Sequence, residues 1–306
     1  MSERRPLDDI LRLIADLPAP DADARHASLD RLAAQGAFGR IAELAGWLAS
    51  WRSDPRVRRP ILALYVSAHA GSEGDSSASA QARLERLAAG GGLASLIARA
   101  QGAGVEVFDL ALARPSPDAA QRPAMSEREC AATIAFGMEA LAKEPDLLML
   151  SDAAEGSARA AAALALALFG GAAADWAEPS QAAWVEATAA RARQAGASAP
   201  LGMLAQIGGR EVAALAGAVL AARVQRTPVL IDGYAAAAAC AVLDALDPDA
   251  LAHVRVGHAP QTPGCARLLD RLGLKPLIDV ELTEGEGAGA VAALSLVKLA
   301  GDVATL

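Results

Sequence analysis

Short apolar runs alternate with longer helical patterns over most of the chain after residue 60. Such runs are typical of strands that are covered on both faces of a parallel sheet. Parallel neighbours need a crossover connection, and a helix supplies one. We therefore expect an α/β fold with a doubly wound, mostly parallel sheet of about six strands flanked by helices. The expected strands are 61–66, 105–110, 147–150, 229–231, 254–256 and 277–280.

The segments between these runs are rich in alanine and leucine, and their periodicity predicts closely packed helices. The segment 80–99 is broken at Gly90–Gly92, and a last helix over 287–300 closes the chain. The other expected helices are 126–142, 157–169, 181–194, 211–224, 234–246 and 263–272.

The N-terminal segment shows helical patterns only, at 7–17 and at 28–51, the second interrupted at Gly36 and Gly39. Prolines between them separate two helical units. We expect residues 1–58, with part of the C-terminal helix, to form a small helical domain beside an α/β domain of residues 59–306.

Composition narrows the class of protein. A net charge of -8 and a pI near 5.1 argue against a general binder of nucleic acid or of anionic membranes. The longest apolar run, 158–170, is shorter than a membrane span and contains Arg159, so no membrane role is expected. The three cysteines lie far apart without a CxxC motif, which favours a reducing cytoplasm.

Candidate chemistry lies in the loops that follow the strands, where parallel sheets bind ligands. The loop before the last helix holds Glu286 among Gly285, Gly287 and Gly289. A carboxylate there could accept a proton from a bound substrate, and the free N–H groups of the helix could bind an anion. The alternative is an acidic first turn that the helix dipole favours.

Other loops hold weaker candidates. Asp232 follows a buried strand and is either a ligand residue or an N-cap for a helix over 235–241. His258 could bind, titrate or only hydrogen-bond a neighbouring loop, and no histidine has metal-ligand spacing. Asp152 and Ser157 could cap a helix or contact a ligand.

Common nucleotide and hydrolase motifs are missing from the sequence. It contains neither a Walker A sequence nor a G-x-S-x-G elbow. The first expected strand is not followed by G-x-G-x-x-G, which argues against a nicotinamide-dependent oxidoreductase.

Several motifs nevertheless occur together in a recognisable order. The C-terminal ones are Gly208-Gly209-x-Glu211, Ile231-Asp232-Gly233, Gly257-His258, Pro276-Leu277 and Gly285-Glu286-Gly287-x-Gly289-Ala290. The upstream ones are Gly36-Ala-Phe-Gly39-Arg40, Glu73-Gly74-Asp75-Ser76, Ala89-Gly90-Gly91 and Pro123-Ala124-Met125-Ser126. Together they resemble the nicotinate-nucleotide–dimethylbenzimidazole phosphoribosyltransferases of cobalamin lower-ligand assembly.

The resemblance implies a reaction and a set of site residues. Glu286 would be the general base that takes the N–H proton of the benzimidazole while its other ring nitrogen attacks the ribose of nicotinate mononucleotide, giving α-ribazole phosphate. It also implies a homodimer that needs neither cofactor nor metal. Substrate-binding roles are expected for Ser76, Asp152, Gly156, Ser157, Gly208, Asp232, His258, Gly285, Gly287 and Gly289.

Three departures from the family pattern leave a second function open. The aspartate of the family's D-H-G is absent from Ala68-His69-Ala70, and residues 151–159 replace its G-E-M-G-I-G-N-T-T loop. No lysine lies between Lys143 and Lys275, where the family has a phosphate-binding lysine, although Arg159 or Arg191 could replace it. The alternative is a catalytically degenerate relative that binds a ligand or serves as a regulatory or partner subunit, as in a heteromer with an active paralogue.

Overall fold

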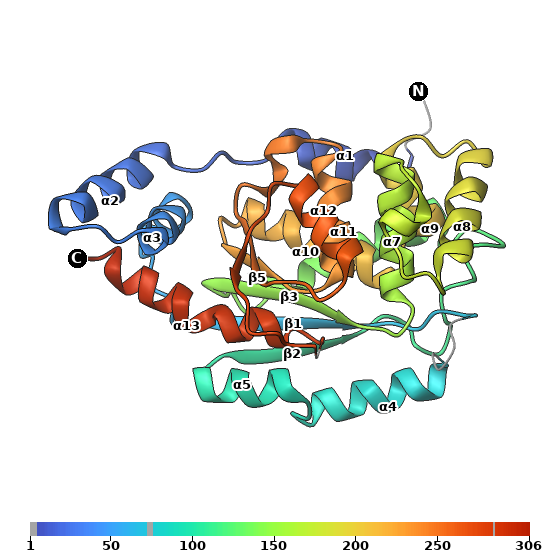
Figure 1. Cartoon of the computed structure of the whole chain (residues 1–306), viewed down its shortest axis with the longest axis horizontal. Coiled ribbons are helices and arrows are strands. Elements are labelled where there is room, and N and C mark those ends of the chain that lie inside the picture. The colour runs from blue at the N-terminus through green and yellow to red at the C-terminus, as the bar shows by residue number, and fades with distance from the viewer. Residues whose placement is uncertain (1–4, 72–75, 284) are drawn as a thin grey trace.

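The computed structural model describes residues 5–71, 76–283 and 285–306, and its centre is one sheet of six parallel strands (Figure 1). The strand order is β2-β1-β3-β4-β5-β6. The chain runs from β1 to β2 on one side and then continues from β3 on the other, so the order reverses beside β1. The strands are β1 (Pro60–Val66), β2 (Gly104–Asp109), β3 (Leu147–Ala153), β4 (Val229–Ile231), β5 (Val254–His258) and β6 (Pro276–Ile278).

All six expected strands are present, and the α/β prediction is confirmed, but three strands end two or three residues from the expected position. Strand β5 continues to His258, which was expected in the loop after it. Pairing of β3 with β1 continues to Val66 and Ala153, so Ser151 and Asp152 lie in the strand and not in the loop expected after it. By contrast β6 ends at Ile278, because the Val280 amide donates to the His258 ring instead of continuing the ladder.

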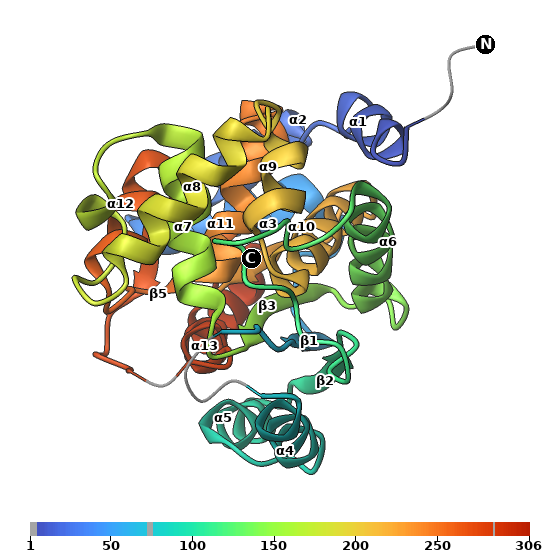
Figure 2. The same cartoon turned by 90° about the vertical axis from the view of Figure 1, so that its right-hand side faces the viewer.

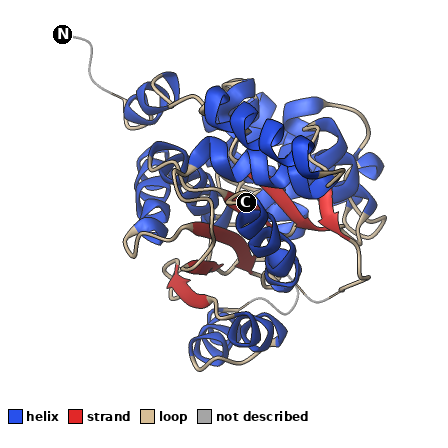
Figure 3. Cartoon of the chain, turned by 90° about the vertical axis from the view of Figure 1, so that its left-hand side faces the viewer, coloured by secondary structure: helices blue, strands red, loops and turns tan. Residues whose placement is uncertain are grey.

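Helices cover both faces of this sheet (Figures 2 and 3). Successive residues of β1 show the two layers: Ile61, Ala63 and Tyr65 face one core, whereas Leu62 and Leu64 face the other. Helices α3 (Arg40–Trp51), α4 (Ser77–Ala88), α5 (Leu93–Gln101) and α13 (Ala288–Val303) pack on the second face. The first face is covered by α6 (Glu127–Gly137), α7 (Ser157–Phe169), α8 (Ala182–Gln194), α9 (Pro200–Ile207), α10 (Arg210–Val224), α11 (Tyr234–Asp244) and α12 (Pro263–Arg271).

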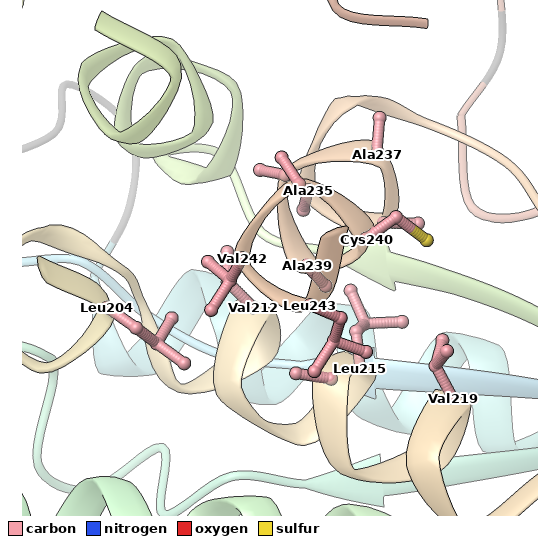
Figure 4. Packing of buried hydrophobic residues seen from close by; sticks show 14 of the residues in the cluster. Leu204, Val212, Leu215, Val219, Ala235, Ala237, Ala239, Cys240, Val242 and Leu243 are labelled. Carbon is pink, nitrogen blue, oxygen red and sulfur yellow. The ribbon is translucent and has the colours of Figure 1, made fainter. Parts of the chain in front are cut away.

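The helix predictions hold with small shifts, except that α9 was not expected. This helix has only eight residues, too few for a clear period, and Pro200 opens it at a position where the missing amide costs nothing. The alanine-rich α11 is buried over 235–243 and packs against α10, as Figure 4 shows for Ala239 and Leu243 beside Leu215. Small side chains therefore allow close helix contact, as the composition suggests.

The N-terminal helices divide between two regions. Helix α1 (Asp8–Ala15) contributes Ile10 and Ile14 to the core on the first face of the sheet. Helix α2 (Ala22–Gln35) packs on α3, and Leu32, Ala45 and Ala304 form a small separate cluster with the end of α13. The division of the chain at residue 58 remains a prediction. No helix among the described residues has both the length and the hydropathy that crossing a bilayer requires.

Two glycines let α6 and α10 cross in backbone contact. A Cβ on Gly217 would lie 1.8 Å from the Ile134 carbonyl oxygen, and one on Gly137 would lie 1.9 Å from that of Ala214. Neither neighbour is a flexible side chain, so neither contact can relax without moving a helix.

We predict that Gly217→Ala lowers the free energy of unfolding by about 3 kcal/mol, because the added methyl group forces α6 away from α10. Urea unfolding followed by circular dichroism measures it. The matched control is Gly202→Ala in α9, where nothing lies within 4 Å of the added Cβ and a small gain from helix propensity is expected. Equal stability of the two variants would contradict the proposed close crossing.

Candidate active site

A cleft of about 420 Å³ opens beyond the carboxyl ends of β3, β4 and β5. Helix α4 and the loop before α13 complete its walls. The structure brings together there these predicted site residues: Asp152, Ser157, Asp232, His258, Gly285, Glu286 and Gly289.

Four predicted residues do not line the cleft. Ser76 is exposed, and its side chain caps α4 by accepting from the Ser79 amide. Gly156 precedes α7, and Gly208 lies at the end of α9 against Leu204. Gly287 has φ +81°, and a Cβ there would lie 2.6 Å from a Leu62 methyl carbon, so its role is to admit the loop against the sheet. Of the motif 73–76 and the loop 284–290, residues 73–75 and 284 lie outside the described residues.

Glu286 is held by two unusual features of its surroundings. Its φ is +58°, a left-handed conformation that a non-glycine residue adopts at a cost of about 1 kcal/mol. Its carboxylate forms an ion pair with the Arg86 guanidinium on α4, and 23% of its side chain is exposed. The Arg86 guanidinium therefore holds the carboxylate in place, and the carboxylate remains accessible from the cleft.

Asp232 joins the end of β4 to the start of α13. Its carboxylate accepts from the Gly289 amide at 2.9 Å. Burial raises the pKa of Asp232, and hydrogen bonds from the Gly289 and Ala290 amides oppose that rise. The expectation of an N-cap for the following helix was wrong, because α11 has no side-chain cap at Gly233.

The same contact overturns a further expectation. The first amides of α13 were expected to be available to an anion, but Asp232 already occupies them. The carboxylate reaches them because Gly289 has no side chain, and a Cβ there would lie 2.7 Å from Asp232 Oδ1. This end of α13 therefore needs no substrate phosphate to be satisfied.

His258 supports the loop that leads to Glu286. Its Nε2 atom accepts from the Val280 amide at 3.0 Å and from the Leu282 amide at 3.4 Å. An accepting Nε2 places the ring proton of a neutral imidazole on Nδ1. The sequence left three roles open for His258: binding a ligand, titrating, or forming a hydrogen bond with a neighbouring loop. The structure shows the hydrogen bond with the loop.

Beside the cleft, buried acidic groups form a network at the ends of β1 and β3. Glu211 accepts from the Ser67 hydroxyl and lies 2.9 Å from His69 Nε2. Burial alone would raise the pKa of Glu211, but the His69 charge and the hydrogen bonds from His69 and Ser67 hold it below its usual value. Burial and the nearby Glu211 raise the pKa of Asp152 to about 7, against a hydrogen bond from Ser157. Near neutral pH Glu211 is thus charged and Asp152 is partly protonated.

The arginines that could replace the missing lysine are used elsewhere. Arg191 donates to the Ala119 carbonyl and to the Gln206 side chain and carbonyl. Arg159 stacks 4.3 Å over the Trp184 ring and donates to the Gly71 carbonyl. Within the described lining of the cleft, Arg83 of α4 is the one arginine or lysine, and it pairs with Glu155 at 2.9 Å.

Sequence reasoning missed Arg83 and Arg86 as site residues. They are three residues apart on α4, so they share one face of that helix. The spacing of the two arginines was the only sequence signal for them. It was not sufficient, because the sequence does not show that the Gly90–Gly92 turn after this helix lies beside Glu286.

Residues 5–71, 76–283 and 285–306 contain no cluster of three or more histidine, cysteine or acidic side chains that could bind a metal ion.

A cleft at the carboxyl ends of the strands of a doubly wound parallel sheet is typical of an α/β enzyme that acts on a small molecule. A family model described as Phosphoribosyltransferase matches residues 17–305, and the chain belongs to this family. It is similar to nicotinate-nucleotide–dimethylbenzimidazole phosphoribosyltransferases of Brucella anthropi (42% identity, covering 96% of this chain and 93% of the relative) and Allorhizobium ampelinum (44% identity, 96% and 92%). The crystal structure of the Thermus thermophilus enzyme of that name matches with a TM-score of 0.80 at 26% identity, over 98% of this chain and 96% of the other.

We predict that Asp152→Asn stabilises the protein above pH 7. A carboxyl group whose pKa is raised on folding destabilises the folded state when it ionises. This loss of unfolding free energy is absent below about pH 4, grows up to pH 7 and is constant above it. The variant should therefore match the wild type near pH 4 and gain about 2–4 kcal/mol in unfolding free energy at pH 8.

Urea unfolding at pH 4.5, 6 and 8 measures this difference. Asp270→Asn on the exposed face of α12 is the control, and its effect should not change over that range. A variant at position 152 that is no more stable than the wild type at pH 8 would show that the buried charge carries no penalty.

Proposed function

We propose that this chain transfers the phosphoribosyl group of nicotinate mononucleotide to 5,6-dimethylbenzimidazole or a related base, giving α-ribazole phosphate and nicotinate. Family membership and the near-complete coverage of relatives that bear this name support the substrates. The single observation that carries the mechanism is the position of the Glu286 carboxylate, which is paired with Arg86 and lines the cleft.

The reaction needs one proton acceptor and little else from the protein. One ring nitrogen of the acceptor attacks the anomeric carbon, the bond to the nicotinate nitrogen breaks, and its electron pair neutralises the pyridinium. The N–H proton on the other acceptor nitrogen passes to Glu286. Holding two planar rings on either side of a ribose supplies most of the remaining rate.

The open cleft supports turnover over the alternative of a degenerate relative. A cavity of about 420 Å³ is within the size range of small-molecule sites. In this proposal, polar side chains that line the cavity bind the substrates; they are Asp152, Ser157, Asp232 and His258. Arg83 takes the position of the cation nearest the substrate phosphate, in place of the family's lysine.

We also propose a homodimer in the cytoplasm. The relatives' shared family supports the assembly, and the buried free thiols of Cys130, Cys240 and Cys265 are compatible with a reducing compartment. Sedimentation equilibrium should give twice the 31.0 kDa mass of one chain. A mass of one chain at all concentrations would contradict the dimer.

We predict that Glu286→Gln lowers turnover of nicotinate mononucleotide and dimethylbenzimidazole by about 10²–10⁴-fold, because the amide cannot accept the proton. Chromatography of α-ribazole phosphate measures the rate, and calorimetry should show unchanged affinity for nicotinate mononucleotide.

Glu281→Gln is the matched control. Glu281 lies in the same loop, is exposed and also has a positive φ of 55°, but it does not line the cleft. Full activity of the Glu286 variant would overturn the assignment of the base, and a wild-type protein that forms no product would overturn the proposed function.

A further inference from the structure

Arg86 and Glu286 meet although 200 positions separate them in the sequence. Nη2 of Arg86 donates to Oε1 of Glu286, and the two side chains are 45% and 23% exposed. The pair closes the gap between α4 and the loop before α13, at the mouth of the cleft that Glu286 lines.

The glycine turn between α4 and α5 provides the space for this pair. A Cβ on Gly92 would lie 2.8 Å from Arg86 Nη1 and 3.2 Å from Glu286 Oε2. A Cβ on Gly91 would lie 2.8 Å from both Cγ and the carbonyl oxygen of Arg86. Any side chain at these positions would push the guanidinium away from the carboxylate, so the glycines and the ion pair form one unit.

The backbone conformation of Glu286 also indicates that its surroundings hold it in place. A non-glycine residue at φ +58° keeps this conformation only where its surroundings fix it. Gly285 and Gly287 leave the backbone free to turn, and the Arg86 contact fixes the direction of the side chain. Within the part of the chain that the structure describes, Arg86 is the side chain that donates a hydrogen bond to this carboxylate.

We propose that Arg86 is a positioning residue, which orients the Glu286 carboxylate toward the acceptor base and pairs with its negative charge between turnovers. This inference rests on the proposed function. Before the reaction, the guanidinium charge stabilises the carboxylate over the neutral acid. After the acceptor N–H proton has moved to Glu286, the cation faces a neutral group, which favours release of the proton to water.

Other charged groups line the cleft or pack beside its turn, but they have partners of their own. Arg83 pairs with Glu155, Asp232 accepts from Gly289, and His258 accepts from the 280–282 loop. The charged and titratable groups that line the described cleft or lie beside the glycine turn, and that stay unchanged in every variant of the pH experiment, are Arg83, Arg99, Asp152, Glu155, Asp232, Tyr234, His258 and Cys265.

The test is steady-state kinetics of Arg86→Gln between pH 5 and 9, with nicotinate mononucleotide and dimethylbenzimidazole. We expect kcat to fall about 10–100-fold through loss of orientation, with KM for nicotinate mononucleotide unchanged. The acidic limb of kcat/KM should move to higher pH, because the variant removes the positive charge beside the carboxylate. Arg86→Lys should restore the limb and only part of kcat, because it keeps the charge but not the planar fork.

Arg128→Gln, on the exposed face of α6, is the control for loss of one arginine and should change neither kcat nor the pH profile. An Arg86→Gln enzyme with wild-type kcat and an unmoved acidic limb would overturn the inference, provided that Glu286→Gln is inactive. A fall in kcat without a shift of the limb would also overturn it, since a purely structural defect gives that result. Absence of product from the wild type, or full activity of Glu286→Gln, would instead remove the proposed function on which it rests.

Discussion

The hydrogen bond from the Gly289 amide to the Asp232 carboxylate connects the start of α13, and with it the loop that holds Glu286, to the end of β4. Asp232 directly follows β4, the strand that lies between β3 and β5 in the sheet. Helix α13 can reach it because Gly289 and Gly257 have no side chains: a Cβ on Gly257 would lie 2.5 Å from the Ala290 α-carbon. Glu286 lies three positions before Gly289, so its place at the cleft follows from this one contact between strand and helix.

The acidic groups around the cleft lie in different electrostatic surroundings. Glu211 is buried but stays ionised, because His69 and Ser67 donate to it. Burial, together with the nearby Glu211 charge, raises the pKa of Asp152 to about 7. Glu286 forms an ion pair with Arg86. In the proposed reaction the leaving ring is a cation until the bond breaks, and acidic side chains stabilise that local charge, whereas the phosphate of the same substrate requires a cation, the role proposed for Arg83.

The sequence predicted the strands well and the contacts between distant segments poorly. Largely apolar runs marked the strands, because most strands of this sheet are covered on both faces. The edge strand β2 is the exception, since it contains Glu106 and is only partly buried. The eight-residue α9 was missed because so short a helix shows little periodicity. For Asp232 the sequence offered either a ligand role or a cap on the next helix, whereas the structure shows its carboxylate at the start of a helix more than fifty residues later. Arg86 was not found for the same reason, since only the fold brings α4 beside residue 286.

The most direct test of this account is a crystal structure of the protein with α-ribazole phosphate. We predict that the benzimidazole nitrogen that does not bear ribose lies about 2.6–3.2 Å from a Glu286 carboxylate oxygen, within hydrogen-bond reach. Product bound in the cleft with that nitrogen facing another group, and Glu286 still paired only with Arg86, would contradict the claim that this carboxylate takes the proton.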